Sequence, residues 1–238
     1  INGCVQLTAV PVSGFQPTTY NVQPIPYNPY PFNAGAPIII NQDDVWGPVT
    51  NLPFNFCFYG NTYNQAQPGS NGLVSFDLYP VGSYCTWPIS APIPDASNPP
   101  NSIMGPFHDI NPAFGGAVYA QLYGVAPCRV FVVSWNQNAM FSCTSSFTTQ
   151  RIAIYETTNI IEVYIQDKPL CSTWNSGASI LGVHNDNANQ AVVVAGHNYP
   201  TQWSSTNEAW RWTPAGAINY TVNWFEVGNP VAIATTDT

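Results

Sequence analysis

Only four of the 238 residues in this chain are lysine or arginine: Arg129, Arg151, Lys168 and Arg211. Helices of soluble proteins draw heavily on Lys, Arg, Glu, Ala and Leu, so this scarcity excludes a helical bundle. Charged residues of both signs make up 7% of the chain, and solubility must come from Asn, Gln, Ser and Thr instead. Such a surface is typical of an extracellular β protein, and we expect an all-β fold.

Short runs rich in β-branched and aromatic residues follow the first forty residues and are separated by Gly, Pro and Asn clusters. This pattern is typical of a sandwich or barrel, and no segment shows sustained helical periodicity. We predict an antiparallel β-sandwich with strands at 38–40, 54–59, 72–77, 118–122, 130–135, 150–156, 159–166, 179–183, 191–195 and 219–226.

The domain organisation follows from the distribution of proline and small polar residues. Residues 1–37 contain too many prolines for a central strand, so we predict an extended segment that lies along the domain. A single domain should cover residues 1–227, and the tail at 228–238 indicates a linker to further domains. The start at Ile1 is what we expect of an exported chain after its signal peptide is removed.

One hairpin can be placed in register. A turn at 157–158 sets Ile152 opposite Val163 and Ile154 opposite Ile161, so that the apolar residues share one face. Continued away from the turn, the same pairing places Cys143 beside Ser172, the residue after Cys171. This predicts a disulfide between Cys143 and Cys171 at the open end of the hairpin.

The chain has six cysteines and no CxxC pair, which favours structural disulfides in an oxidising compartment over zinc or redox chemistry. The four cysteines outside the hairpin allow three pairings. We predict Cys57 with Cys85, because they flank the strand at 72–77, which leaves Cys4 with Cys128.

A net charge of −8 argues against nucleic acid and against an anionic membrane surface, because both need clustered basic residues. No apolar run is long enough to span a bilayer. We expect neither nucleic acid binding nor membrane insertion.

Two loops, 41–44 and 184–187, are rich in side-chain oxygens of the kind that bind Ca²⁺, although neither has EF-hand spacing. Asx turns are the first interpretation of these loops, and a Ca²⁺ site is the second. If Ca²⁺ is bound, the candidate ligands are Asp43, Asp44, Asp109 and Asp186, and otherwise we expect no cofactor.

We expect no catalytic residues. His108 and Asp109 are adjacent, and on a strand their side chains would point to opposite faces, so we expect Asp109 to cap the turn into Asn111 instead. His184 and His197 lack metal-ligand spacing, and no GxSxG motif is present. A glycosidase would need two facing carboxylates, which folding could bring together.

Several tryptophans lie near Asn, Gln and Ser, an environment that suits sugar rings. Core burial is the first interpretation of these residues, and a glycan platform is the second. The candidates for that platform are Trp174, Trp203 and Trp210.

Five stretches carry a family likeness in order and spacing: LPFNFCFYGNTY at 52–63, GSNGLVSFD at 69–77, GPFHDI at 105–110 followed by GGAVY at 115–119, VFVVSW at 130–135, and IYE at 154–156. Together they resemble the NIDO domain of nidogen-type extracellular proteins. This resemblance implies an extracellular module.

A second likeness covers nearly the whole chain and includes NSIMGPFHDI at 101–110, YETTNIIEVYI at 155–165 and NEAWR at 207–211. These phrases are similar to the N-terminal region of very large Bacteroidota surface proteins, which are exported by type IX secretion and associated with gliding motility or adhesion. The likeness implies a non-catalytic module, an adhesin or a structural unit, at the cell surface. Its partners would be extracellular proteins or glycans and further domains of the same polypeptide. A lectin-like glycan binder is the alternative, and a secreted hydrolase is the third.

Overall fold

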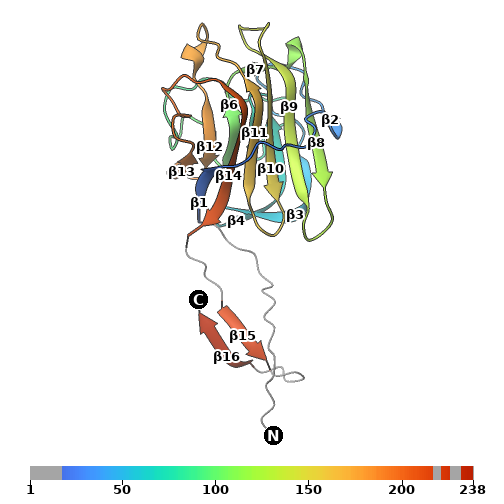
Figure 1. Ribbon diagram of the computed structural model, residues 1–238, viewed down its shortest axis with the longest axis vertical. Helices are drawn as coiled ribbons and strands as arrows, with labels where there is room; N and C mark the ends of the chain where they lie inside the picture. The colour runs from blue at the N-terminus through green and yellow to red at the C-terminus, as the bar shows by residue number, and fades with distance from the viewer. Residues whose placement is uncertain (1–17, 217–220, 226–231, 238) are drawn as a thin grey trace.

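The computed structural model describes residues 18–216, 221–225 and 232–237. Two antiparallel sheets pack face to face as a sandwich (Figure 1), and no α-helix occurs within these ranges. The predicted fold class is confirmed. In the same ranges, no helix is long and apolar enough to cross a membrane.

The first sheet has the order β1-β14-β11-β10-β9-β8-β2, with β7 paired to β9. Its strands are β1 (Thr19–Pro24), β2 (Ala36–Ile38), β7 (Ile110–Asn111), β8 (Ala117–Tyr123), β9 (Val130–Met140), β10 (Phe147–Tyr155), β11 (Ile161–Lys168) and β14 (Ser205–Ala215).

The second sheet has the order β13-β12-β6-β5-β4-β3. Its strands are β3 (Thr50–Phe58), β4 (Asn61–Gly69), β5 (Leu73–Ser75), β6 (Ser102–Phe107), β12 (Ile180–His184) and β13 (Ala191–Val193). Two single-turn 3₁₀ helices are η1 (Pro112–Phe114) and η2 (Asn175–Gly177).

A separate two-stranded sheet pairs β15 (Thr221–Phe225) with β16 (Ala232–Asp237). β15 falls within the strand predicted at 219–226. β16 lies in the tail, 228–238, that we predict as a linker to further domains, and the structure places a strand within it.

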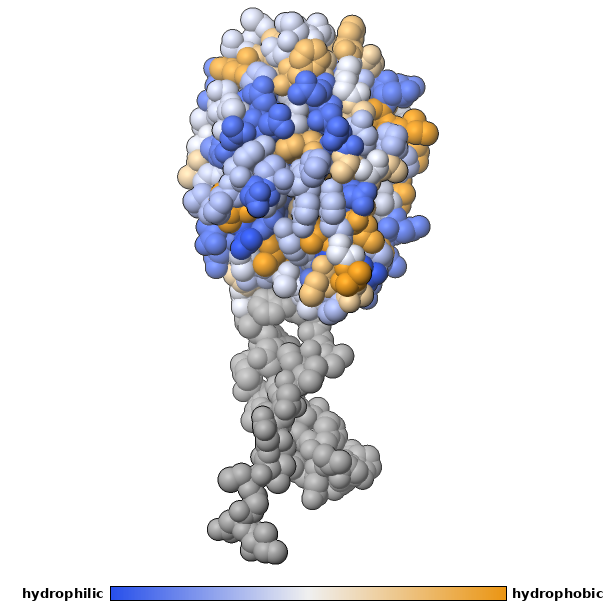
Figure 2. Space-filling model, turned by 45° about the vertical axis from the view of Figure 1, so that its right-hand side comes forward, coloured by the Kyte–Doolittle hydropathy of each residue, from blue (hydrophilic) through white to orange (hydrophobic). Residues whose placement is uncertain are grey.

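The core lies between the two sheets and is built from inward-facing residues of both, including Phe56, Ile103, Trp135 and Trp212. A Cβ added to Gly105 on β6 would lie 2.6 Å from a side-chain carbon of Ile152, so the glycine allows the sheets to approach closely. Outside the core, on the face drawn in Figure 2, hydrophobic residues are scattered among hydrophilic ones.

The register predicted for the β10–β11 hairpin is confirmed: Ile152 pairs with Val163, and Ile154 with Ile161. The disulfide between Cys143 and Cys171 is also confirmed, with a Cα–Cα distance of 5.9 Å.

The pairing of Cys57 with Cys85 is wrong, because both are buried free thiols. The amide of Cys57 bonds to the side chain of Asn159, next to the β10–β11 turn, whereas the amide of Cys85 bonds to the carbonyl of Asp44 at the other end of the sandwich. Cys128 is a free, exposed thiol, and its predicted partner Cys4 lies outside the described residues.

A segment of the predicted N-terminal extension, residues 25–35, crosses the outer face of the first sheet between β1 and β2 (Figure 1). Arg151 on β10 bonds to the carbonyls of Tyr30 and Pro31 in this crossing segment and stacks on Phe32. Arg151 is consequently buried although its side chain points away from the sandwich core, and Glu162, on the same face of the sheet, is buried as well.

The strand register defines two ends of the sandwich. Thr19, where β1 begins, pairs with Ala215, where β14 ends, beside the β10–β11 turn; we call this the terminal end. At the opposite end, Lys168 of β11 pairs with Ser205 of β14, and the disulfide closes the hairpin. We call this the distal end.

Candidate metal centre

Three of the four aspartates proposed from the sequence as Ca²⁺ ligands lie together at the distal end. Asp43, Asp44 and Asp109 each place a carboxylate oxygen so that all three oxygens lie within 4.8 Å of one another. Asp186, the fourth, is exposed elsewhere and accepts hydrogen bonds from Asn61 and Asn187. The fold therefore selects three residues from the candidate set.

Pairing between loops brings the aspartates together. Asp43 and Asp44 lie between β2 and β3, and Asp109 lies between β6 and β7. Val45 bonds through its amide to the Ser70 hydroxyl, 3.1 Å, and through its carbonyl to the Ser70 amide, 2.9 Å. These two bonds fix the first loop against the turn between β4 and β5.

Asn71, in the same turn, connects both loops. Its side-chain nitrogen Nδ2 donates to Asp44 Oδ1 at 2.9 Å, and its side-chain oxygen Oδ1 accepts from the backbone amide of Ile110 at 3.0 Å. Gly72 follows at φ +80°, and a Cβ there would lie 2.1 Å from the carbonyl oxygen of Pro106. Only glycine allows this contact, so the stretches 69–77 and 105–110 meet to build the centre.

Asp109 is the most buried of the three, with 6% of its surface exposed. The indole nitrogen of Trp174 donates to its Oδ2 at 2.7 Å. Its Oδ1 is buried with no hydrogen-bond partner, and so is Oδ1 of Asp43. Buried carboxylate oxygens without partners are costly, so these two atoms require an explanation.

Burial and mutual repulsion make the three carboxylates hard to ionise. Burial raises the pKa of Asp109 to about 7, against the Trp174 hydrogen bond and with further repulsion from Asp44 and Asp43. Burial and the charge of Asp44 raise the pKa of Asp43 to about 6. Burial also raises the pKa of Asp44, against the hydrogen bond from Asn71. A bound cation would favour the ionised form of all three.

A small pocket adjoins the centre. His108, Asp109, Lys168 and Trp174 are among its lining residues, as are Met140, Phe141, Cys171, Asn175, Gly177 and Ala178. The structure places His108 and Asp109 in the connection between β6 and β7 and not on a strand, and both residues line the pocket. Asp109 does not cap the following turn: Asn111 does, through the amide of Ala113.

His108 and Lys168, the two basic residues that line this pocket, form hydrogen bonds with other residues of the protein. Burial lowers the pKa of His108 to about 3, and its Nε2 contacts Gln150 at 3.1 Å. Burial lowers the pKa of Lys168 to about 7, and its Nζ donates to the carbonyl of Trp203 at 2.7 Å. Perturbed titratable groups beside a pocket are typical of functional sites, although structural networks also produce them.

Of the three tryptophans proposed as a glycan platform, Trp203 and Trp210 both lie beside the ring of His197, and Trp174 lines the pocket. Trp203 is buried and its indole nitrogen donates to the carbonyl of Ser179, while that of Trp210 donates to Glu208. Trp174 is half-buried at the pocket, packed against Trp87 and Phe141. Of the three, Trp174 is the one that donates a hydrogen bond to an aspartate of the cluster.

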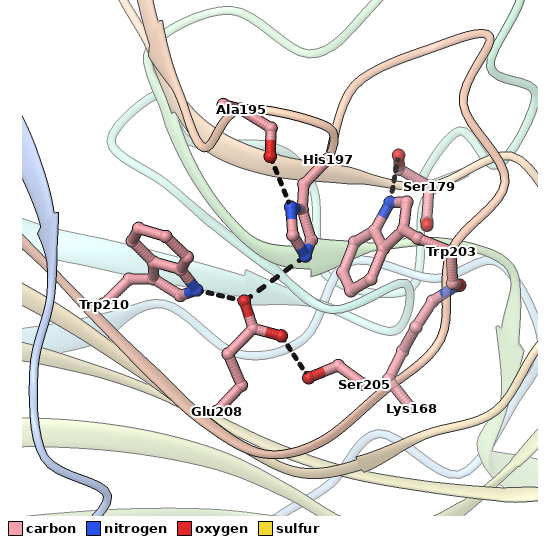
Figure 3. Close-up of polar contacts among 8 residues, drawn as sticks. All are labelled: Lys168, Ser179, Ala195, His197, Trp203, Ser205, Glu208 and Trp210. Atoms are coloured by element: carbon pink, nitrogen blue, oxygen red, sulfur yellow. Dashed lines mark hydrogen bonds and ion pairs between the residues drawn. The ribbon is translucent and has the colours of Figure 1, made fainter.

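A second polar cluster surrounds Glu208 on β14 (Figure 3). His197 contacts the Glu208 carboxylate at 3.3 Å, and Trp210 and Ser205 donate to it. Burial opposes ionisation of Glu208, but these hydrogen bonds outweigh it and hold its pKa at about 2. Burial likewise opposes protonation of His197, but the hydrogen bond to Glu208 outweighs it and raises the pKa of the imidazole.

The His197–Glu208 pair should make stability depend on pH. The Glu208 contribution is present above its ordinary pKa of 4.5, and that of His197 is present below its ordinary pKa of 6.5 and lost as pH rises through the folded value. We expect His197→Gln to cost about 1 kcal/mol near pH 5.5 and much less near pH 8.5. Thermal denaturation at both pH values checks this, and an equal cost at the two would contradict it.

Asn71 and Lys168 were not identified from the sequence. Asn71 lies in one of the stretches with the family likeness, between Ser70 and Gly72, where an amide side chain signals a turn and gives no hint of its distant partners. Lys168 ends a strand, and nothing in its neighbours indicates that it is buried.

Comparisons with known proteins place the chain in a family. A search of curated proteins and a search of solved structures each gave no match. The family model described as "NIDO related" matches residues 19–225, which spans both sheets of the sandwich. This chain therefore belongs to the NIDO-related family.

Proposed function

We propose that this chain is a non-catalytic module of a large bacterial cell-surface protein, and that it binds extracellular protein or glycan with the distal end of its sandwich. The resemblance to N-terminal regions of Bacteroidota surface proteins supports this placement, and with it type IX export and a role in adhesion or gliding. The Cys143–Cys171 disulfide supports an oxidising, extracellular location.

The observation that carries the proposal is the separation of the two ends. The chain enters the sandwich at Thr19 and leaves it at Ala215, and these residues are paired at the terminal end. The aspartates, the pocket and the disulfide lie at the opposite end, near β7 at the top of Figure 1. A module attached through one end presents the loops of the other, as the binding loops of other sandwiches do.

The distal loops have features that suit recognition. The loops that carry Cys143 and Cys171 are covalently joined, which reduces the entropy lost when a partner binds. Trp87, Phe141 and Trp174 form a half-buried aromatic cluster beside them. Aromatic rings beside polar groups are common in interfaces, and they also suit sugar rings. Trp174, next to Asp109, is the observation that favours a lectin-like module as the second candidate.

The protonation and the hydrogen bonds of the basic residues in the pocket support a binding role over a catalytic one. His108 is neutral at physiological pH and engaged by Gln150, and Lys168 is engaged by Trp203. A general base must reach the proton that it removes, and both groups are almost wholly buried.

The proposal is tested by coupling the protein to a surface in two opposite orientations. One protein is coupled through Cys128, which is exposed in the β8–β9 connection at the terminal end. Its matched control carries Cys128→Ser and Ala113→Cys and is coupled through exposed η1 at the distal end. Both proteins carry Cys4→Ser, so that neither is attached through the N-terminal thiol.

The coupled proteins are exposed to mucin, collagen and an array of polysaccharides. We expect the protein held through Cys128 to bind at least one of these, and the control to bind little of it. Binding to glycans alone would select the lectin-like candidate. Equal binding in both orientations would contradict a distal surface, and turnover of chromogenic esters, glycosides or peptides would contradict a non-catalytic module.

A further inference from the structure

We propose that Asp43, Asp44 and Asp109 bind a Ca²⁺ ion at the distal end of the sandwich. The three carboxylates are close enough to share one cation, and they come from two loops that Asn71 and Ser70 fix in place. This proposal goes beyond the binding role above and does not depend on it, since metal binding is measured on the isolated chain.

The first argument is the lack of any other charge partner. The ion pairs of the described residues join Glu156 to Arg129, Glu162 to Arg211 and Glu208 to His197. None of these pairs involves the three aspartates, although Asp109 is almost fully buried. A buried group of like charges is normally balanced by a counter-charge or a metal.

The second argument is independent of the clustering. Oδ1 of Asp109 and Oδ1 of Asp43 are buried acceptors with no donor in the described part of the chain. The neighbouring donors are used elsewhere: the Trp174 indole binds the other oxygen of Asp109, and Asn71 binds Asp44. Buried carboxylate oxygens that lack donors, on two residues of one aspartate cluster, are expected of cation ligands when no cation is bound.

The donor chemistry selects the ion. All three ligands are carboxylates, and no histidine or cysteine belongs to the cluster, which disfavours zinc. Ca²⁺ accepts irregular sets of oxygen ligands supplied by loops, with backbone carbonyls and water completing the coordination, whereas Mg²⁺ demands near-ideal octahedral geometry. Loop carboxylates of this kind favour Ca²⁺.

The ion would connect three segments of the distal end. It would join the 43–44 loop to Asp109, and Asp109 is bonded to Trp174 in the loop that follows Cys171. Calcium would therefore order the surface that carries the aromatic cluster.

Two measurements on the full chain test the proposal. After chelation, added Ca²⁺ should raise Tm by about 5 °C at saturation, with a dissociation constant of about 10⁻⁴–10⁻³ M, the range of extracellular modules. Terbium, which replaces calcium in such sites, should luminesce when the protein is excited through tryptophan, because Trp174 contacts the ligand Asp109.

Conservative variants separate metal binding from folding. Asp43→Asn and Asp109→Asn should each weaken Ca²⁺ binding at least about tenfold, because affinity follows ligand charge. Without metal, both variants should melt no lower than the wild type, since each removes like-charge repulsion. Asp186→Asn, which changes an exposed aspartate outside the cluster, is the matched control and should respond to Ca²⁺ as the wild type does.

Two results would overturn the proposal. The first is a wild-type Tm and terbium signal that do not change at millimolar ion. The second is a calcium response that survives in both Asp43→Asn and Asp109→Asn. An equal response to Mg²⁺ would overturn the assignment of calcium.

Discussion

Replacement of Arg151 with leucine is expected to lower the free energy of unfolding by roughly 3–5 kcal/mol, a large part of the stability of an ordinary domain. The Arg151 guanidinium is fully buried. It donates to the Ser134 hydroxyl at 2.8 Å, to the Tyr30 carbonyl at 2.6 Å and to the Pro31 carbonyl at 2.5 Å. Leucine would leave both carbonyls without a donor and release the crossing segment.

Matched arginine variants make this result specific. Arg129→Leu breaks a partly exposed ion pair with Glu156 and should cost much less than Arg151→Leu, because water screens the pair. Arg151→Lys keeps the charge but lacks the planar fork that reaches three acceptors, so its loss should be intermediate. Urea denaturation measures all three, and an Arg151→Leu loss no larger than that of Arg129→Leu would show that the crossing segment does not depend on Arg151.

Removal of the disulfide by Cys143→Ser with Cys171→Ser is expected to cost about 3 kcal/mol, because the bridge closes a loop in the unfolded chain. The two cysteines are 28 residues apart in sequence. The change should also loosen the loop of Trp174, which begins at Cys171. Denaturation of the double variant measures the loss.

Cys128→Ser is the control for this prediction, because Cys128 is an exposed free thiol. It should change stability by less than about 0.5 kcal/mol. Peptide mapping without reduction should recover a fragment that joins Cys143 to Cys171. A double variant as stable as Cys128→Ser, or a different partner for Cys143, would contradict the bridge.

The predictable parts of the fold are the strands in which apolar and polar residues alternate along a short stretch of sequence. The apolar residues of β10 and β11 alternate about a short turn, so the sequence alone fixed the pairing of Ile152 with Val163. Three of the strands that were missed lack this signal. β4 is rich in Asn and Gln and contains Pro68, β6 contains Gly105 and Pro106, and β1 was discounted for its prolines although it pairs with β14 at an edge of the sheet.

The individual residues of the candidate site could be predicted from the sequence, but not which of them the fold brings together. Asp43, Asp44 and Asp109 were named because carboxylates in loops can bind Ca²⁺, and Asp186 was named for the same reason. Only tertiary structure separates the three from the fourth, because the contacts of Asn71 with Asp44 and Ile110 span 27 and 39 residues. The burial of Arg151 was hidden for the same reason: its partners are backbone carbonyls about 120 residues away.

The amide and indole N–H spectrum of the full chain, recorded by NMR before and after Ca²⁺ is added to chelated protein, tests the central claim most directly. We predict that the signals of Asp44, Val45, Ile110 and the Trp174 indole shift, because these groups surround the three carboxylates. The signals of Thr19 and Ala215, at the terminal end, should stay in place. An unchanged spectrum at millimolar Ca²⁺, or shifts confined to the terminal end, would contradict a binding module whose distal end is built around a cation.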